Sequence, residues 1–293
     1  QFLDYDLPTV VSASLFGFHT PNDTSPTSTD LTWAAAASDY GLQVYAVKSP
    51  AEYADVYSPL ERVKDAYFEV KNRAGDTLLT SSIYKNVYEN KKWNFTLSLR
   101  PATYPFADGV TGASVATHGY TLELYGVNFE AGIKQESFSE TVALTNASGS
   151  VIVESAKRVY AGAHRTNYTG SVLTNTDIKA SSIRYWTDYL PSSTLDLQAK
   201  TADAFGRNNP YENAYSYQTK APSVFIPRAQ TLALNWDLAN ISESDAAGRF
   251  TITDYSSGSN ASTYPSTYQD DLSDINLRQH SGRGDFFKAN FTP

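Results

Sequence analysis

The sequence predicts an all-β fold: an antiparallel β-sandwich or jelly roll with few short helices, followed by a C-terminal β-rich extension. Alternation of apolar and polar residues with a period of two dominates the chain, and helical periodicity is scarce. Short strand-like segments are separated by turn signals rich in Gly, Asn, Asp and Ser. Many short half-buried strands with turn-rich connections are typical of two sheets packed around one core.

The clearest strand is predicted at 93–100. Trp93, Phe95, Leu97 and Leu99 share one face, polar residues occupy the other, and Pro101 ends the pattern. This alternation predicts that Trp93 lies in the core, and a second alternating segment predicts the same of Trp236. Further strands are predicted at 42–48, 66–71, 119–127, 157–164, 181–187, 232–238 and 249–255.

Turns and helices complete the predicted elements. Turn signals occupy 72–76, 107–112, 146–149 and 256–259. One helix is predicted over 191–205, because Pro191 favours a helix start, an apolar stripe follows and Gly206 suits the C-terminal end. A weaker helical pattern covers 31–38.

The pattern changes after residue 206, where a Tyr-rich stretch is bracketed by two prolines, Pro210 and Pro222. We therefore predict a sandwich domain over 1–205, a connector over 206–229, and a β-rich extension or the start of a following module over 230–293. The chain has no methionine and begins with Gln1, so we expect a processed chain or one segment of a longer polypeptide.

Composition excludes several function classes. A net charge of −8 disfavours a nucleic-acid-binding surface. The absence of cysteine excludes a disulfide scaffold, a zinc ribbon, an iron–sulfur protein and a cysteine nucleophile. No apolar run approaches the roughly 20 residues that a membrane-spanning helix requires, so no membrane insertion is predicted.

Catalytic motifs are missing from the sequence, and we predict no enzyme. There is no GxSxG, HExxH or phosphate-binding loop. A retaining glycosidase needs two carboxyl groups about 5–5.5 Å apart. Glu123 has no acidic partner two residues away, and Glu130 lies beyond Gly126. No metal-ligand spacing relates the four histidines, His19, His118, His164 and His280.

No cofactor is predicted, although calcium is kept open. Asn175, Thr176 and Asp177 offer oxygen ligands, as do Asp270, Asp271 and Asp274, but neither segment has EF-hand spacing. Solvated turns are the preferred interpretation. The tripeptide at 283–285 matches an integrin-binding motif and equally suits a tight turn. Glycosylation sequons occur at Asn22, Asn94, Asn146, Asn167, Asn240, Asn260 and Asn290.

The segment from Leu15 to Lys200 resembles a laminin-G-like, concanavalin A-like jelly-roll module. The resemblance is carried by WNFTLSLRP at 93–101, TLELYGVN at 121–128, RVYAGAHRTNYTG at 158–170 and the stretch at 177–200. It implies that Tyr185 or Trp186 packs as an aromatic against the sandwich. The order of segments over 231–287 is similar to long structural proteins of marine tailed phages, which implies a virion polypeptide.

The resemblance implies a non-catalytic structural or adhesive module of an extracellular, cell-surface or virion assembly. Its expected partners are copies of itself or other structural proteins, and surface glycans. The alternative is a lectin-like carbohydrate-binding module of a secreted or cell-surface protein; a glycoside hydrolase ranks third. Exposed aromatics that could stack on sugars are Trp33, Tyr40, Tyr185 and Trp186. Connector residues that could contact a neighbour are Tyr211, Tyr215 and Tyr217.

Overall fold

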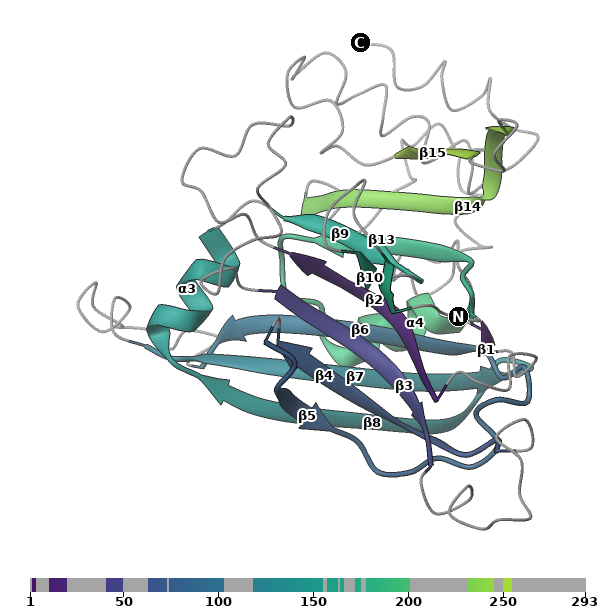
Figure 1. The fold of residues 1–293 in the computed structure, drawn as a ribbon, viewed down its shortest axis with the longest axis horizontal. Coiled ribbons are helices and arrows are strands. Elements are labelled where there is room, and N and C mark those ends of the chain that lie inside the picture. The colour runs from purple at the N-terminus through teal and green to yellow at the C-terminus, as the bar shows by residue number, and fades with distance from the viewer. Residues whose placement is uncertain are drawn as a thin grey trace, which may run out of the picture. The chain divides into compact units, whose positions relative to one another are not determined.

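The structure is a computed structural model, shown in Figure 1. It describes residues 2–3, 11–19, 41–49, 63–72, 74–102, 118–154, 157–162, 164–165, 172–174, 178–200, 231–244 and 250–254. The chain divides into two compact units, Gln1–Ala180 and Ser181–Pro293. Every strand pairing between the described strands is antiparallel, so the all-β prediction is confirmed for this part of the chain.

The first unit contains a five-stranded and a three-stranded sheet. The larger sheet has the order β5-β4-β3-β2-β9, and the smaller sheet has the order β6-β7-β8. The larger sheet comprises β2 (Ser12–His19), β3 (Gly41–Lys48), β4 (Ala66–Asn72), β5 (Thr77–Thr80) and β9 (Arg158–Ala161). The smaller comprises β6 (Trp93–Pro101), β7 (Tyr120–Glu130) and β8 (Ile133–Leu144). Two short pairs join β1 (Phe2–Leu3) with β12 (Ile178–Lys179), and β10 (His164–Arg165) with β11 (Val172–Thr174).

One hydrophobic core lies between these two sheets, which Figure 1 shows as two layers of strands. Phe68 of β4 is fully buried at its centre. Its ring lies 5.4 Å from that of Phe138 on β8 and 5.2 Å from that of Trp93 on β6, measured between centroids. Aromatic pairs at these distances add attraction beyond the area they bury. The predicted core position of Trp93 is confirmed.

Strand β8 is an edge of the smaller sheet, and its core-facing side mixes apolar and acidic residues. Phe138 packs into the core, and Glu136 and Glu140 lie two residues away on either side, hence on the same face. Burial raises the pKa of Tyr84, and the nearby charges of Glu140 and Glu136 raise it further.

Two of the predicted turns fall on described residues, and they have different outcomes. The turn at 72–76 is confirmed: the backbone N–H of Asp76 donates to Asn72 Oδ1 at 2.9 Å, and Gly75 has a φ of 94°. The turn predicted at 146–149 is wrong, because helix α3 (Asn146–Glu154) begins there. Gly149 serves close packing instead: a Cβ at this position would lie 2.1 Å from the ring of Tyr120.

Thr145 caps helix α3, since its Oγ1 accepts a hydrogen bond from the backbone N–H of Ser148 at 3.2 Å. Replacing Thr145 by alanine is expected to cost about 1 kcal/mol of stability, because that N–H loses its partner. Urea denaturation of the full chain measures the loss. Thr145→Ser keeps the hydroxyl and should retain most of the stability; an equal loss in both variants would contradict the capping role.

The second unit contains a sheet of order β13-β14-β15 and helix α4 (Ser192–Lys200). The strands are β13 (Ser182–Trp186), β14 (Leu232–Ser244) and β15 (Phe250–Asp254). The compact units divide between Ala180 and Ser181, before the predicted boundary near 205, because β13 pairs with β14. The predicted connector at 206–229 lies outside the described residues and stays a prediction. Trp236 was predicted to lie in the core, but in the structure it is only half-buried.

Candidate functional site

The face of the five-stranded sheet that points away from the core is built largely from polar and aromatic residues. In β3, Leu42, Val44 and Ala46 enter the core, so the residues between them point to the opposite side. Strand register places their neighbours on that same side. We call this surface the outer face; its residues are Ser14, Gly17, Gln43, Tyr45, Val47, Tyr67, Glu69, Lys71 and Tyr160.

Gln43 and Ser14 are two buried polar residues on the outer face. Gln43 is 2% exposed and Ser14 is 1% exposed. Neither Nε2 nor Oε1 of Gln43, nor Oγ of Ser14, has a hydrogen-bond partner within the part of the chain that the structure describes. Buried polar side-chain atoms are nearly always paired, so this combination marks a place where a partner is missing.

A bulge and a glycine set the position of the Gln43 amide. The register between β2 and β3 shifts between Ser14 and Phe16, which leaves Ser14 and Gly17 on the same side of the sheet. Gly17 lies opposite Gln43, and a Cβ on Gly17 would come within 2.3 Å of the Gln43 amide. The amide therefore lies against the backbone of β2. A residue larger than glycine at position 17 would occupy the space that the amide fills.

The charged residues on this face are already paired with each other. Lys71 Nζ lies 2.8 Å from Glu69 Oε1, and Thr77 Oγ1 donates to Glu69 Oε2 at 3.2 Å. Lys71 Nζ also lies 5.6 Å from the centre of the Tyr45 ring, within the range of a cation–π contact. The opposite charges of Lys71 and Glu69 therefore compensate each other, and the Lys71 ammonium group lies near the ring of Tyr45.

The hydrogen bond to Glu69 is the largest cause that raises the pKa of Lys71 above its ordinary value of 10.5, against an opposing effect of burial. A raised pKa means that the bond stabilises the folded chain below about pH 10.5 and that this contribution is lost as pH rises through the folded-state pKa. Melting temperatures between about pH 9 and pH 12 test this. Lys71→Met should lose stability less steeply over that window; parallel curves for both proteins would refute the assignment.

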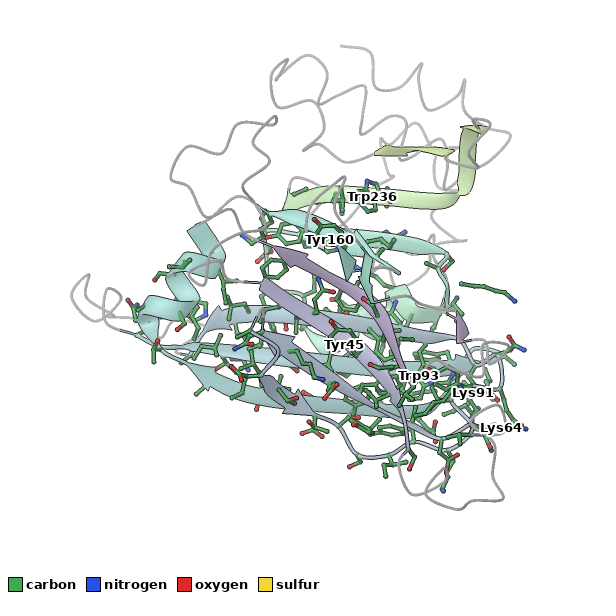
Figure 2. The ribbon with its side chains drawn as sticks, in the orientation of Figure 1. Tyr45, Lys64, Lys91, Trp93, Tyr160 and Trp236 are labelled. Atoms are coloured by element: carbon green, nitrogen blue, oxygen red, sulfur yellow. The ribbon has the colours of Figure 1, made fainter. Side chains whose placement is uncertain are left out.

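Tyr45 and Tyr160 supply the aromatic surface of the outer face; Figure 2 shows both, on β3 and β9 of one sheet. Each is 9% exposed. Tyr160 lies opposite Gly17, and Gly17 lies opposite Gln43, so both rings are near neighbours of the same amide. The outer face thus combines an amide, a hydroxyl and two aromatic rings with the paired charges of Glu69 and Lys71.

Two of the predicted glycan-stacking residues, Tyr185 and Trp186, lie on β13 in the second unit. Both are half-buried, and they pair with Leu234 and Leu232 of β14 across a register shift. Burial raises the pKa of Tyr185. The other predicted aromatics, Trp33, Tyr40, Tyr211, Tyr215 and Tyr217, lie outside the described residues, as do the acidic segments considered for calcium.

Glu123, the residue considered for glycoside hydrolysis, lies on β7 of the smaller sheet. Its carboxylate accepts a hydrogen bond from Ser139 Oγ at 2.6 Å, and Arg100 Nε lies 3.9 Å away. The residues directly opposite it on the neighbouring strands are Ser98 and Thr141. Its cross-strand neighbours are therefore hydroxyl residues and not a second carboxylate.

Sequence reasoning did not find the outer face. The segment at 42–48 predicts a strand, and its polar residue Gln43 suggests that the face opposite Leu42, Val44 and Ala46 points to solvent. In the structure all of β3 is buried, on both faces. A signal was present in Gly17, an isolated glycine in an apolar strand, which indicates close approach of another group.

The described part of the chain contains no group of three or more His, Cys, Asp or Glu residues able to hold a metal ion. No helix within it has the length and apolar character needed to cross a membrane. Comparison of the chain with protein-family models, with curated proteins and with solved structures found no match.

Proposed function

We propose that this chain is a non-catalytic structural or adhesive module of an extracellular or virion assembly, of the concanavalin A-like jelly-roll type, and that it contacts glycans. The observation that carries the proposal is the outer face, where Gln43 and Ser14 are buried without partners among the described residues. Such a surface suits binding, because it offers polar groups for hydrogen bonding, while the neighbouring Glu69 and Lys71 are paired with each other.

The architecture of the first unit supports this proposal. Two antiparallel sheets share one core, which is the arrangement of a β-sandwich module. The resemblance of residues 15–200 to laminin-G-like modules, and of 231–287 to phage structural proteins, supports placement in a virion or at a cell surface. Copies of the chain and other structural proteins of the same assembly are the proposed protein partners.

A lectin-like module of a secreted or cell-surface protein is the second candidate function. The outer face favours it, because Tyr45 and Tyr160 flank the Gln43 amide. Sugars are held by aromatic stacking combined with amide and hydroxyl hydrogen bonds. The two candidates differ in whether glycan contact is the main role of the chain or accompanies assembly.

The purified full chain tests the proposal in three assays run side by side. Sedimentation velocity measures self-association, affinity electrophoresis measures retention by polysaccharides, and a reducing-sugar assay measures hydrolysis of a β-glucan panel. We expect self-association or retention, and no hydrolysis. Hydrolysis that is abolished by Glu123→Gln would overturn the proposal in favour of an enzyme. A monomer that binds no polysaccharide would overturn it as well.

A further inference from the structure

Strand β6 is an edge of the three-stranded sheet. Among the described strands it pairs only with β7, beside which Figure 1 shows it. The N–H of Ala102 donates to the carbonyl of Gly119 at 2.9 Å, which continues the β6–β7 register by one residue. Hydrogen-bonded residues alternate along an antiparallel pair, so the backbone N–H and C=O groups of Phe95, Leu97 and Leu99 point away from β7. These groups are directed at the position of a further strand.

The sequence of β6 gives this edge little protection against strand pairing. Its nine residues pair with β7 without a register shift, so no bulge twists the strand away. Arg100 is its one charged residue, and its one proline, Pro101, is the last residue of the strand. Phe95, Leu97 and Leu99 pack against the core and yet remain partly exposed, so an added strand would bury more apolar area.

A second copy of the chain fits this edge, because β6 is complementary to itself. An antiparallel pair with a twofold axis at Leu97 places Phe95 opposite Leu99 of the second copy and forms roughly six backbone hydrogen bonds. Arg100 then lies opposite Asn94 of the second copy, and the two arginines are about 20 Å apart along the strands, beyond the range of unscreened repulsion. No like charges therefore face each other across the contact.

We propose that β6 pairs with β6 of a second copy, antiparallel about Leu97, and joins the two three-stranded sheets into one. This inference rests on the proposed self-association and names its surface. The register places Thr96 of one copy directly opposite Ser98 of the other, with both side chains on the face away from the core. Because a twofold contact uses the same edge on both copies, it gives a closed dimer.

Sedimentation velocity of the full chain at rising concentration measures the dimer. Thr96→Lys/Ser98→Lys places two pairs of like charges across the contact, so we expect the dissociation constant to rise about tenfold. Thr96→Glu/Ser98→Lys places opposite charges at both points and should restore the affinity. In both variants the lysine at position 98 lies opposite Glu123 of β7, which favours the folded monomer. Ser137→Lys/Thr141→Lys adds the same charge to exposed positions of β8 and should leave the dimer unchanged.

Cross-linking tests the register, because the chain contains no cysteine of its own. Residues that face each other without backbone hydrogen bonds have Cα atoms about 4.5 Å apart, within the range of a disulfide. A mixture of Thr96→Cys and Ser98→Cys chains should therefore form a mixed disulfide dimer under mild oxidation. Each variant alone should form little, because its two cysteines would be diagonal neighbours with Cα atoms about 7–8 Å apart.

The remaining outcomes overturn the inference and show whether the proposed function falls with it. A dimer that Thr96→Lys/Ser98→Lys does not weaken, or the absence of the mixed disulfide, overturns pairing through β6 and leaves the proposed self-association standing. A monomer at every concentration that is retained by polysaccharides overturns the inference and leaves glycan contact standing. A monomer without polysaccharide binding overturns both. Far-ultraviolet circular dichroism of each variant separates lost pairing from lost folding.

Discussion

Replacing Phe68 by alanine is expected to lower the free energy of unfolding by about 3–5 kcal/mol. Phe68 of the five-stranded sheet is fully buried, and its ring contacts three aromatic rings of the three-stranded sheet, those of Trp93, Phe95 and Phe138. Its removal therefore loses the transfer free energy of one large side chain and leaves a cavity at the point where the two sheets meet. Urea denaturation followed by far-ultraviolet circular dichroism measures the change.

Ile83→Ala is the matched control for this prediction, because Ile83 is a large apolar residue that is 50% exposed. Its replacement should change stability by no more than about 0.5 kcal/mol. A loss below about 1 kcal/mol for Phe68→Ala would mean that the two sheets do not share the core described here.

Gln43→Met is expected to act in the opposite direction and to raise the free energy of unfolding by about 1–3 kcal/mol in the absence of ligand. The substitution keeps the volume of the side chain and removes two buried polar atoms that have no partner among the described residues. Thermal and urea denaturation of the ligand-free chain measure the gain.

The sign of this change is informative because most substitutions at buried positions destabilise. Gln43→Leu serves as the comparison: leucine branches at Cγ, one atom nearer the backbone than the amide carbon, and it is shorter than glutamine, so it fills the space beside Gly17 less well and the gain should shrink or reverse. Equal or lower stability of Gln43→Met than of the natural chain would show that the amide is satisfied in the folded protein.

The sequence predicts best those elements that bury only one face, because burial of one face leaves a regular alternation of apolar and polar residues. Strand β6 shows this well, because Phe95, Leu97 and Leu99 pack against the core while the residues between them are polar. Strand β8 was not predicted, since Glu136 and Glu140 interrupt its core-facing side and hide the alternation. Helix α3 was taken for a turn, because Asn146 and Gly149 are common turn residues and the cap from Thr145 becomes evident only in three dimensions.

The candidate site depends on contacts between strands that are distant in sequence, which is why local patterns did not reveal it. Gln43 and Gly17 become neighbours only through the register of β2 with β3, and Tyr160 joins them through β9. A polar residue within a strand ordinarily indicates a solvent-facing side. Gln43 departs from this rule, because both faces of β3 are buried and its side chain therefore does not face solvent.

The acidic residues of β8 limit how copies of this chain can join. A strand at the edge of a sheet offers open backbone groups to a second molecule, and charges on its inner side are a known protection against such pairing. Glu136 and Glu140 would be drawn into an apolar, continuous sheet if another strand were added beside β8, and their desolvation opposes that addition. Copies that assemble would therefore avoid strand pairing at β8 and would join through other surfaces.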